Sequence, residues 1–182
     1  RFLHKIYDNS QSPEHREQVQ RSRGVLDKAA EMSGWGKDLP ANHGLGIAVH
    51  HSFASYVAMA MHVEVKGREI TIHRVDCAVD CGLVLNPDIA SAQIEGAVIM
   101  GLGFALNPEI SFKDGAVVNS NFDDYPILAI GEAPAEIHVG FVGQQYRSTG
   151  IGEPGVPVTA PALANAIFAA TGKRHRSWPI KL

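Results

Sequence analysis

The sequence predicts an α+β fold, in which an antiparallel or mixed sheet of hairpins packs against helices. Apolar and polar residues alternate with a period of two between 45 and 79, as half-buried strands require. Three other stretches carry apolar residues at helical spacing, over 12–36, 88–106 and 160–171. With 182 residues, 45% of them apolar, the chain is long enough to bury a core.

The first helix is predicted from a start signal at Ser12 and Pro13. Apolar residues then follow a helical stripe until the chain enters 34–44, a stretch rich in Gly and Pro that indicates a loop. We therefore expect an N-terminal helical segment over 1–36 and a second unit over 43–182.

Two or three antiparallel strands are expected in 45–79, with a turn at the sequence KGRE, residues 66–69. Asn86 and Pro87 end this region, and a helix is expected to run from about 88 to 106. Each glycine inside a helix costs up to about 1 kcal/mol. The helix nevertheless contains Gly96, Gly101 and Gly103. So many glycines predict close approach to a neighbouring backbone or a ligand.

In the C-terminal third, we expect a hairpin, a loop, a strand and a helix to follow one another. Residues 109–118 are predicted to form a hairpin, 121–128 a loop and 135–142 another strand. Thr159 is expected to cap a last helix over 160–171, because threonine favours that position.

The charge of the chain argues against a nucleic-acid partner, and its hydropathy argues against a membrane-spanning segment. A net charge of −3, a sequence pI near 6.3 and dispersed cations argue against nucleic-acid binding. The longest apolar run, 97–106, is about half of the ~20 residues that cross a bilayer, so no membrane span is expected. The sequence begins at Arg1 without methionine and is expected to be a fragment, so the compartment, bacterial cytoplasm or periplasm, stays open.

Cysteines and histidines offer no recognisable metal spacing. In an extended strand Cys77 and Cys81 would lie about 13 Å apart, so we expect two buried thiols and no disulfide. His50 and His51 are adjacent and would face opposite ways. The remaining candidates lack ligand-like spacing, so ordinary surface or strand histidines are expected: His43, His62, His73 and His138. No protein metal ligand is predicted.

The stretch STGIGEPGVPVTAP, residues 148–161, surrounds Glu153 with glycines and prolines. Its GxGxxG pattern is not a phosphate cradle, because Glu153 would put negative charge beside the phosphates and two prolines remove amide donors that phosphates need. Two interpretations of Glu153 remain open: a solvated or helix-capping acid, or a carboxylate fixed toward a bound ligand. Gln93, inside the glycine-rich helix, is either a surface glutamine or a second polar group that contacts the same ligand as Glu153.

A resemblance to a known family rests on two motifs that occur in this order: QIEGA in NPDIASAQIEGAVIMGLGFAL and GEPG in GIGEPGVPVTAPALANAIFAATG. Over about 43–182 the chain resembles the C-terminal part of the molybdenum-binding large subunit of the xanthine oxidase family, in particular isoquinoline 1-oxidoreductase beta and membrane-bound aldehyde dehydrogenase subunits. The resemblance implies part of a molybdopterin-binding domain.

What the resemblance implies is a hydroxylase that oxidises an aldehyde or an N-heteroaromatic ring with oxygen from water. Its cofactor is a molybdenum pyranopterin, expected as the cytosine dinucleotide. Glu153 matches the family's general base and Gln93 a glutamine placed against the cofactor. The cofactor would also be lined by Ser148, Thr149, Gly150, Ile151 and Gly152. Phe104 and Tyr125 are candidates for the substrate pocket.

Departures from the family limit this prediction. The family's further cofactor loops lie in upstream domains that are not in this sequence, and its [2Fe-2S] clusters belong to a small partner subunit or another domain. By itself this polypeptide is expected to be inactive and free of metal. Two alternatives stay open: a non-enzymatic α+β module whose glycine loop binds a nucleotide or a protein partner, and a hydrolase that uses Glu153, which lacks a second acid at fixed spacing.

Overall fold

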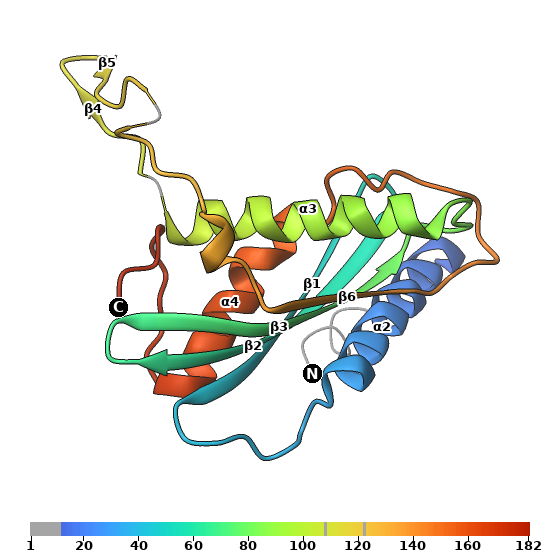
Figure 1. The fold of residues 1–182 in the computed structure, drawn as a ribbon. Helices are drawn as coiled ribbons and strands as arrows, with labels where there is room; N and C mark the ends of the chain where they lie inside the picture. Colours follow the sequence, from blue (N-terminus) through green and yellow to red (C-terminus); the bar gives the residue numbers. More distant parts are fainter. Residues whose placement is uncertain (1–11, 108, 122) are drawn as a thin grey trace.

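A four-stranded mixed sheet forms the centre of the molecule (Figure 1). The computed structural model describes residues 12–182 except 108 and 122. The strands are β1 (His43–Ser52), β2 (Ser55–Lys66), β3 (Glu69–Asp80) and β6 (Glu136–Phe141), in the order β1-β2-β3-β6. The first three are antiparallel neighbours and β6 is parallel to β3. The predicted hairpins, the turn at 66–69 and the strand near 135–142 are confirmed.

Helices cover both faces of the sheet (Figure 1). They are α2 (Pro13–Ser33), α3 (Pro87–Leu106) and α4 (Val156–Thr171), with a short 3-10 turn η1 (Ile130–Glu132). Val25 and Ala29 of α2 pack on Ala58 and Ala78 on one face. The other face forms the main core with α3 and α4. β2 is therefore buried almost throughout, because apolar layers lie on both sides of it.

The predicted start of α2 is confirmed. The Ser12 hydroxyl accepts a hydrogen bond from the amide of His15 at 3.1 Å, and Pro13 stands in the first turn. The helix ends at Gly34, which adopts the left-handed conformation with φ of 66°. Residues 1–11 of the expected N-terminal segment lie outside the described part of the chain, and the proposed division at 36/43 stays a prediction.

α3 also begins as expected, with the Asn86 side chain accepting from the amide of Ile89 at 3.1 Å. Gly101 faces α4 so closely that an added Cβ would lie 2.6 Å from the Cβ of Thr159. The expectation of close approach therefore holds for Gly101. Gly96 and Gly103 face open space instead.

The expected start of the last helix is wrong. α4 begins at Val156, with Gly155 at the capping position, and Thr159 lies buried inside the first turn. Its hydroxyl donates to the carbonyl of Gly155 at 3.0 Å. Pro157 is tolerated there because amides of the first turn need no intrahelical acceptor. Glu153 is consequently three residues from the helix, and its carbonyl accepts from the amide of Val156 at 3.0 Å.

The predicted hairpin is formed by β4 (Phe112–Lys113) and β5 (Ala116–Val117), and it projects beyond the C-terminal end of α3 (Figure 1).

Among the described helices, α3 alone is long and apolar enough to cross a membrane. Seven of its residues are buried in this fold, while Ile89, Met100 and Phe104 are exposed.

Glycine in β1 lets α4 lie directly on the strand. An added Cβ at Gly46 would lie 2.0 Å from the backbone nitrogen of Ala166, so Gly46→Ala must push the helix away. We expect a loss of about 1 to 3 kcal/mol in the free energy of unfolding, measured by urea denaturation. Gly24→Ala is the control, because this exposed position in α2 has open space around it and should gain about 0.5 to 1 kcal/mol. Equal effects of the two changes would contradict the packing argument.

Candidate functional site

A buried ion pair fixes the end of β3, where the candidate site begins. The guanidinium of Arg21, from α2, donates two hydrogen bonds to Asp80, at 2.7 and 2.9 Å, and the two side chains are 9% and 2% exposed. The same guanidinium lies over the rings of Tyr56 and Tyr146. Hydrogen bonding to Asp80 raises the pKa of Arg21 above its usual value, so the guanidinium stays protonated.

Asp80 also accepts from the amide of Gly82 at 3.1 Å, which turns the chain after β3. From here the segments 81–84 and 144–149 are joined by hydrogen bonds. The amide of Leu83 donates to Tyr146 at 2.9 Å, and the Ser148 hydroxyl donates to the carbonyl of Leu83 at 2.6 Å. The loop before α4 is thus held by the end of β3.

A second anchor comes from the turn between β1 and β2. The buried Ser55 hydroxyl lies 2.7 Å from the hydroxyl of Thr149 and donates to the carbonyl of Gly150 at 2.5 Å. An added Cβ at Gly150 would lie 2.9 Å from the Cβ of Phe53, so a larger residue would displace the loop. The glycine and hydroxyl residues of the motif therefore bind the loop to the sheet.

These anchors bring most of the predicted site residues together. Gln93, Ser148, Thr149 and Ile151 line one pocket of about 240 Å³, at the N-terminal half of α3. The other lining residues are Cys81, Leu83, Val84, Leu85, Asn86, Ile89 and Ala90. Gly152 lies against Gln93, because an added Cβ would be 3.7 Å from the Nε2 atom. In Figure 1 the segment between β6 and α4 passes along this part of α3.

Several polar groups at this pocket and on the loop that continues from it, where Glu153 lies outside the pocket lining, have no partner within the described part of the chain. They are the carboxylate of Glu153, the side-chain amide of Gln93 and the backbone N–H groups of Ile151, Gly152 and Glu153. Gln93, Gly152 and Glu153 are exposed. A rigid loop with unpaired donors beside a free carboxylate can bind a polar ligand and exchange a proton with it.

Cys81 is the thiol at this pocket. Burial raises its pKa, so the group is a protonated thiol rather than a metal-binding thiolate. Cys77 is also buried, and burial raises its pKa as well. Both cysteines are free, as predicted. The pocket therefore offers hydrogen-bonding groups and no thiolate for direct metal coordination.

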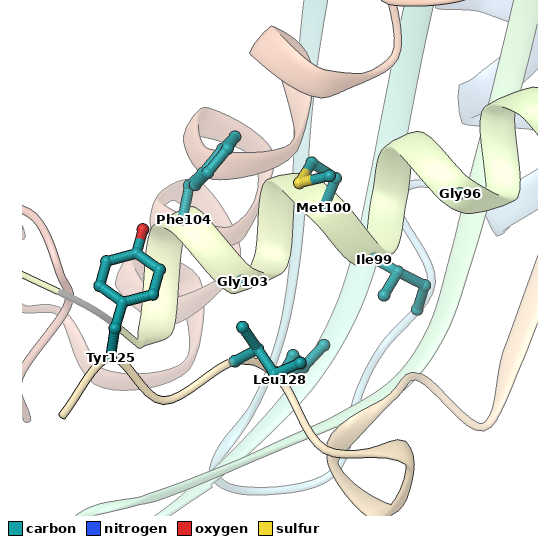
Figure 2. A pocket seen from close by; sticks show the side chains of 8 residues that line it. Gly96, Ile99, Met100, Gly103, Phe104, Tyr125 and Leu128 are labelled. Atoms are coloured by element: carbon teal, nitrogen blue, oxygen red, sulfur yellow. The ribbon is translucent and has the colours of Figure 1, made fainter. Parts of the chain in front are cut away.

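A larger pocket of about 460 Å³ lies on the C-terminal half of α3 (Figure 2). It contains Phe104 and Tyr125, the two residues considered for a substrate pocket, but none of the predicted cofactor residues. Its other lining residues are Gly96, Ile99, Met100, Gly103, Ile127 and Leu128. We place the candidate site at the smaller pocket, because Gln93, Ser148 and Thr149 line it and a polar ligand is oriented by such groups. Glu153 does not line this pocket and follows Ile151, which does, by two residues.

Sequence reasoning missed one cluster. His43, His62 and His73 come together around Glu64 on the sheet, although their sequence spacing resembles no ligand motif. Pairing of antiparallel strands, not sequence separation, sets their distances. A register aligned on the turn at 53–54, between β1 and β2, could have placed His43 and Glu64 opposite each other.

Comparison with known proteins agrees with the fold. A family model described as the molybdopterin cofactor-binding domain matches residues 10–134. The isoquinoline 1-oxidoreductase subunit beta of Brevundimonas diminuta is 37% identical over 167 residues, which is 88% of this chain and 21% of that protein. A membrane-bound aldehyde dehydrogenase of Gluconacetobacter polyoxogenes is 32% identical over 182 residues, or 96% of this chain and 23% of that protein.

Among solved structures, the aldehyde oxidoreductase of Desulfovibrio desulfuricans aligns with a TM-score of 0.58 and 25% identity, over 66% of this chain and 14% of that one. The chain thus spans about a fifth of the length of the curated relatives described above. The matched domain, the sequence likeness and the shared fold show that the chain belongs to the molybdopterin cofactor-binding domain family of xanthine oxidase-type molybdenum-binding subunits.

Proposed function

We propose that this chain supplies the general base and one wall of the cofactor site of a molybdenum hydroxylase. The observation that carries the proposal is the unpaired Glu153 carboxylate, which follows a loop fixed at several points to the sheet. A general base must be held within hydrogen-bond reach of the proton that it removes. Pro154, directly after it, restricts the backbone of the loop, and Gly152, directly before it, lets a ligand approach the backbone.

The free groups fit a hydrogen-bonded cofactor. Gln93 would donate and accept at the pterin side, and the N–H groups of Ile151 and Gly152 would face the ligand. Ser148, Thr149 and Gly150 use their own polar groups to hold the loop, so they would line the cofactor and position those donors. When bound, a molybdenum pyranopterin, expected as its cytosine dinucleotide, supplies the redox chemistry that no side chain here can provide.

The reaction that we propose is hydroxylation of an aldehyde or an N-heteroaromatic carbon with oxygen from water. Glu153 takes the proton from the attacking oxygen, which makes that oxygen a better nucleophile. The two electrons that leave the substrate would pass to [2Fe-2S] clusters in a small partner subunit. The substrate classes follow the relatives named isoquinoline 1-oxidoreductase and aldehyde dehydrogenase.

The test is to produce the full polypeptide with its iron–sulfur partner and measure molybdenum content and turnover. Benzaldehyde and isoquinoline represent the two substrate classes, and ¹⁸O-labelled water reports the source of oxygen. We expect molybdenum in the protein and labelled product from at least one probe. A molybdenum-free preparation that turns over neither probe would favour the non-enzymatic binding module instead.

A further inference from the structure

The three histidines and Glu64 form a cluster on the face of the sheet that α2 covers. Val63 and Val65 of β2 point into the main core, so the alternating residues His62 and Glu64 point to the opposite face. His43 of β1 is paired directly with Glu64.

A β-bulge brings the last member into the group. The register between β2 and β3 shifts between His62 and Val63, so that His62 pairs with Arg74 and Val63 pairs with Ile72. His73 is the extra residue between them, and the bulge turns its ring to the same face. The rings of His43 and His73 are stacked, with centroids 5.2 Å apart.

We propose that His43, Glu64 and His73 bind a divalent transition-metal ion, with zinc as its occupant, and that the ion joins β1, β2 and β3. The Nε2 atom of His43 lies 3.4 Å from one Glu64 oxygen, and that of His73 lies 3.3 Å from the other. In a tetrahedral zinc site, bonds of about 2.1 Å separate ligand atoms by about 3.4 Å. The candidate ligand atoms all lie within 4.8 Å of one another.

His62 completes the arrangement as the partner that orients a ligand. Its Nε2 atom lies 3.0 Å from the Nδ1 atom of His43. If His43 donates its Nδ1–H to His62, its Nε2 lone pair faces the ion, which is the usual pattern for metal-bound histidine.

Access and charge also suit an ion. The Glu64 side chain is 16% exposed and that of His73 is 36% exposed, so the cluster is partly shielded yet open to solvent. The Nζ atom of Lys66 lies 2.6 Å from a Glu64 oxygen. Lys66 is itself exposed and can move aside, so an ion can replace it beside Glu64.

The experiment is a zinc titration by calorimetry on the full polypeptide after dialysis against EDTA. His43→Ala, Glu64→Gln and His73→Ala should each bind one zinc fewer per polypeptide than the original protein. His62→Ala should keep the ion with affinity weakened by about 10- to 100-fold, as for other groups that orient a ligand. Circular dichroism checks that each variant is folded.

The matched control is His138→Ala. His138 also lies beside a glutamate on a strand, 2.9 Å from Glu136, but outside the cluster. It should bind as much zinc as the original protein. An unchanged stoichiometry in all three ligand variants, or the same loss in the control, would overturn the proposal. Because the readout is zinc and not turnover, failure here is distinct from failure of the proposed hydroxylase.

Discussion

Glu153→Gln is expected to abolish substrate hydroxylation in the complete enzyme while leaving its molybdenum content near normal. The amide keeps the size of the side chain but cannot take a proton, and losing a general base costs about 10² to 10⁴ in rate. Glu153 makes no hydrogen bond or ion pair with other described side chains, so the change should not loosen the loop. Steady-state kcat, with molybdenum measured by mass spectrometry, checks this result.

A suitable control is Glu31→Gln, which removes an exposed carboxylate on α2 whose partner is Lys28. It should leave both turnover and molybdenum content unchanged. If Glu153→Gln retained the original kcat, Glu153 would not be the base. If that variant instead lost molybdenum together with activity, Glu153 would act in cofactor binding, and the assigned role would be wrong.

Asp80→Ala is expected to cause the largest loss of stability, about 3 to 5 kcal/mol in the free energy of unfolding. The reason is that Arg21 would remain as a buried charge without its partner. The amide of Gly82 would lose its acceptor as well, at the point where the chain turns toward the candidate site. Urea denaturation of the full polypeptide measures the loss.

Lys181→Ala provides the comparison, because Lys181 pairs with Glu109 at 3.1 Å on the surface and both side chains are largely exposed. Exposed pairs contribute about 0 to 1 kcal/mol. We therefore expect this variant to unfold almost like the original protein. Similar losses for the two variants would mean that burial does not set the strength of the Arg21–Asp80 pair.

Local patterns predicted most elements of the fold. Alternation over 45–79 identified the strands because successive side chains point to opposite faces of the sheet, and the turn at 66–69 set the antiparallel pairing of β2 with β3. Ser12 predicted the start of α2, because a capping side chain acts within three residues of itself. The start of α3 was expected at about 88 because Asn86 and Pro87 end the strand region, and the structure shows that Asn86 is also its cap. The prediction that Thr159 caps the last helix was wrong, because Thr159 lies inside that helix, where its side chain packs against Gly101 and its hydroxyl donates to the carbonyl of Gly155.

The sequence by itself determined the classes of element and the motif residues, Gln93 and Glu153, because both depend on short-range patterns. Only the tertiary structure decided which of these residues meet. Ser148 and Thr149 reach the end of β3 through hydrogen bonds between segments more than 60 residues apart. Strand pairing and a bulge, which no spacing rule contains, bring His43 and His73 to Glu64. Distances between strands depend on register, and the packed core fixes register.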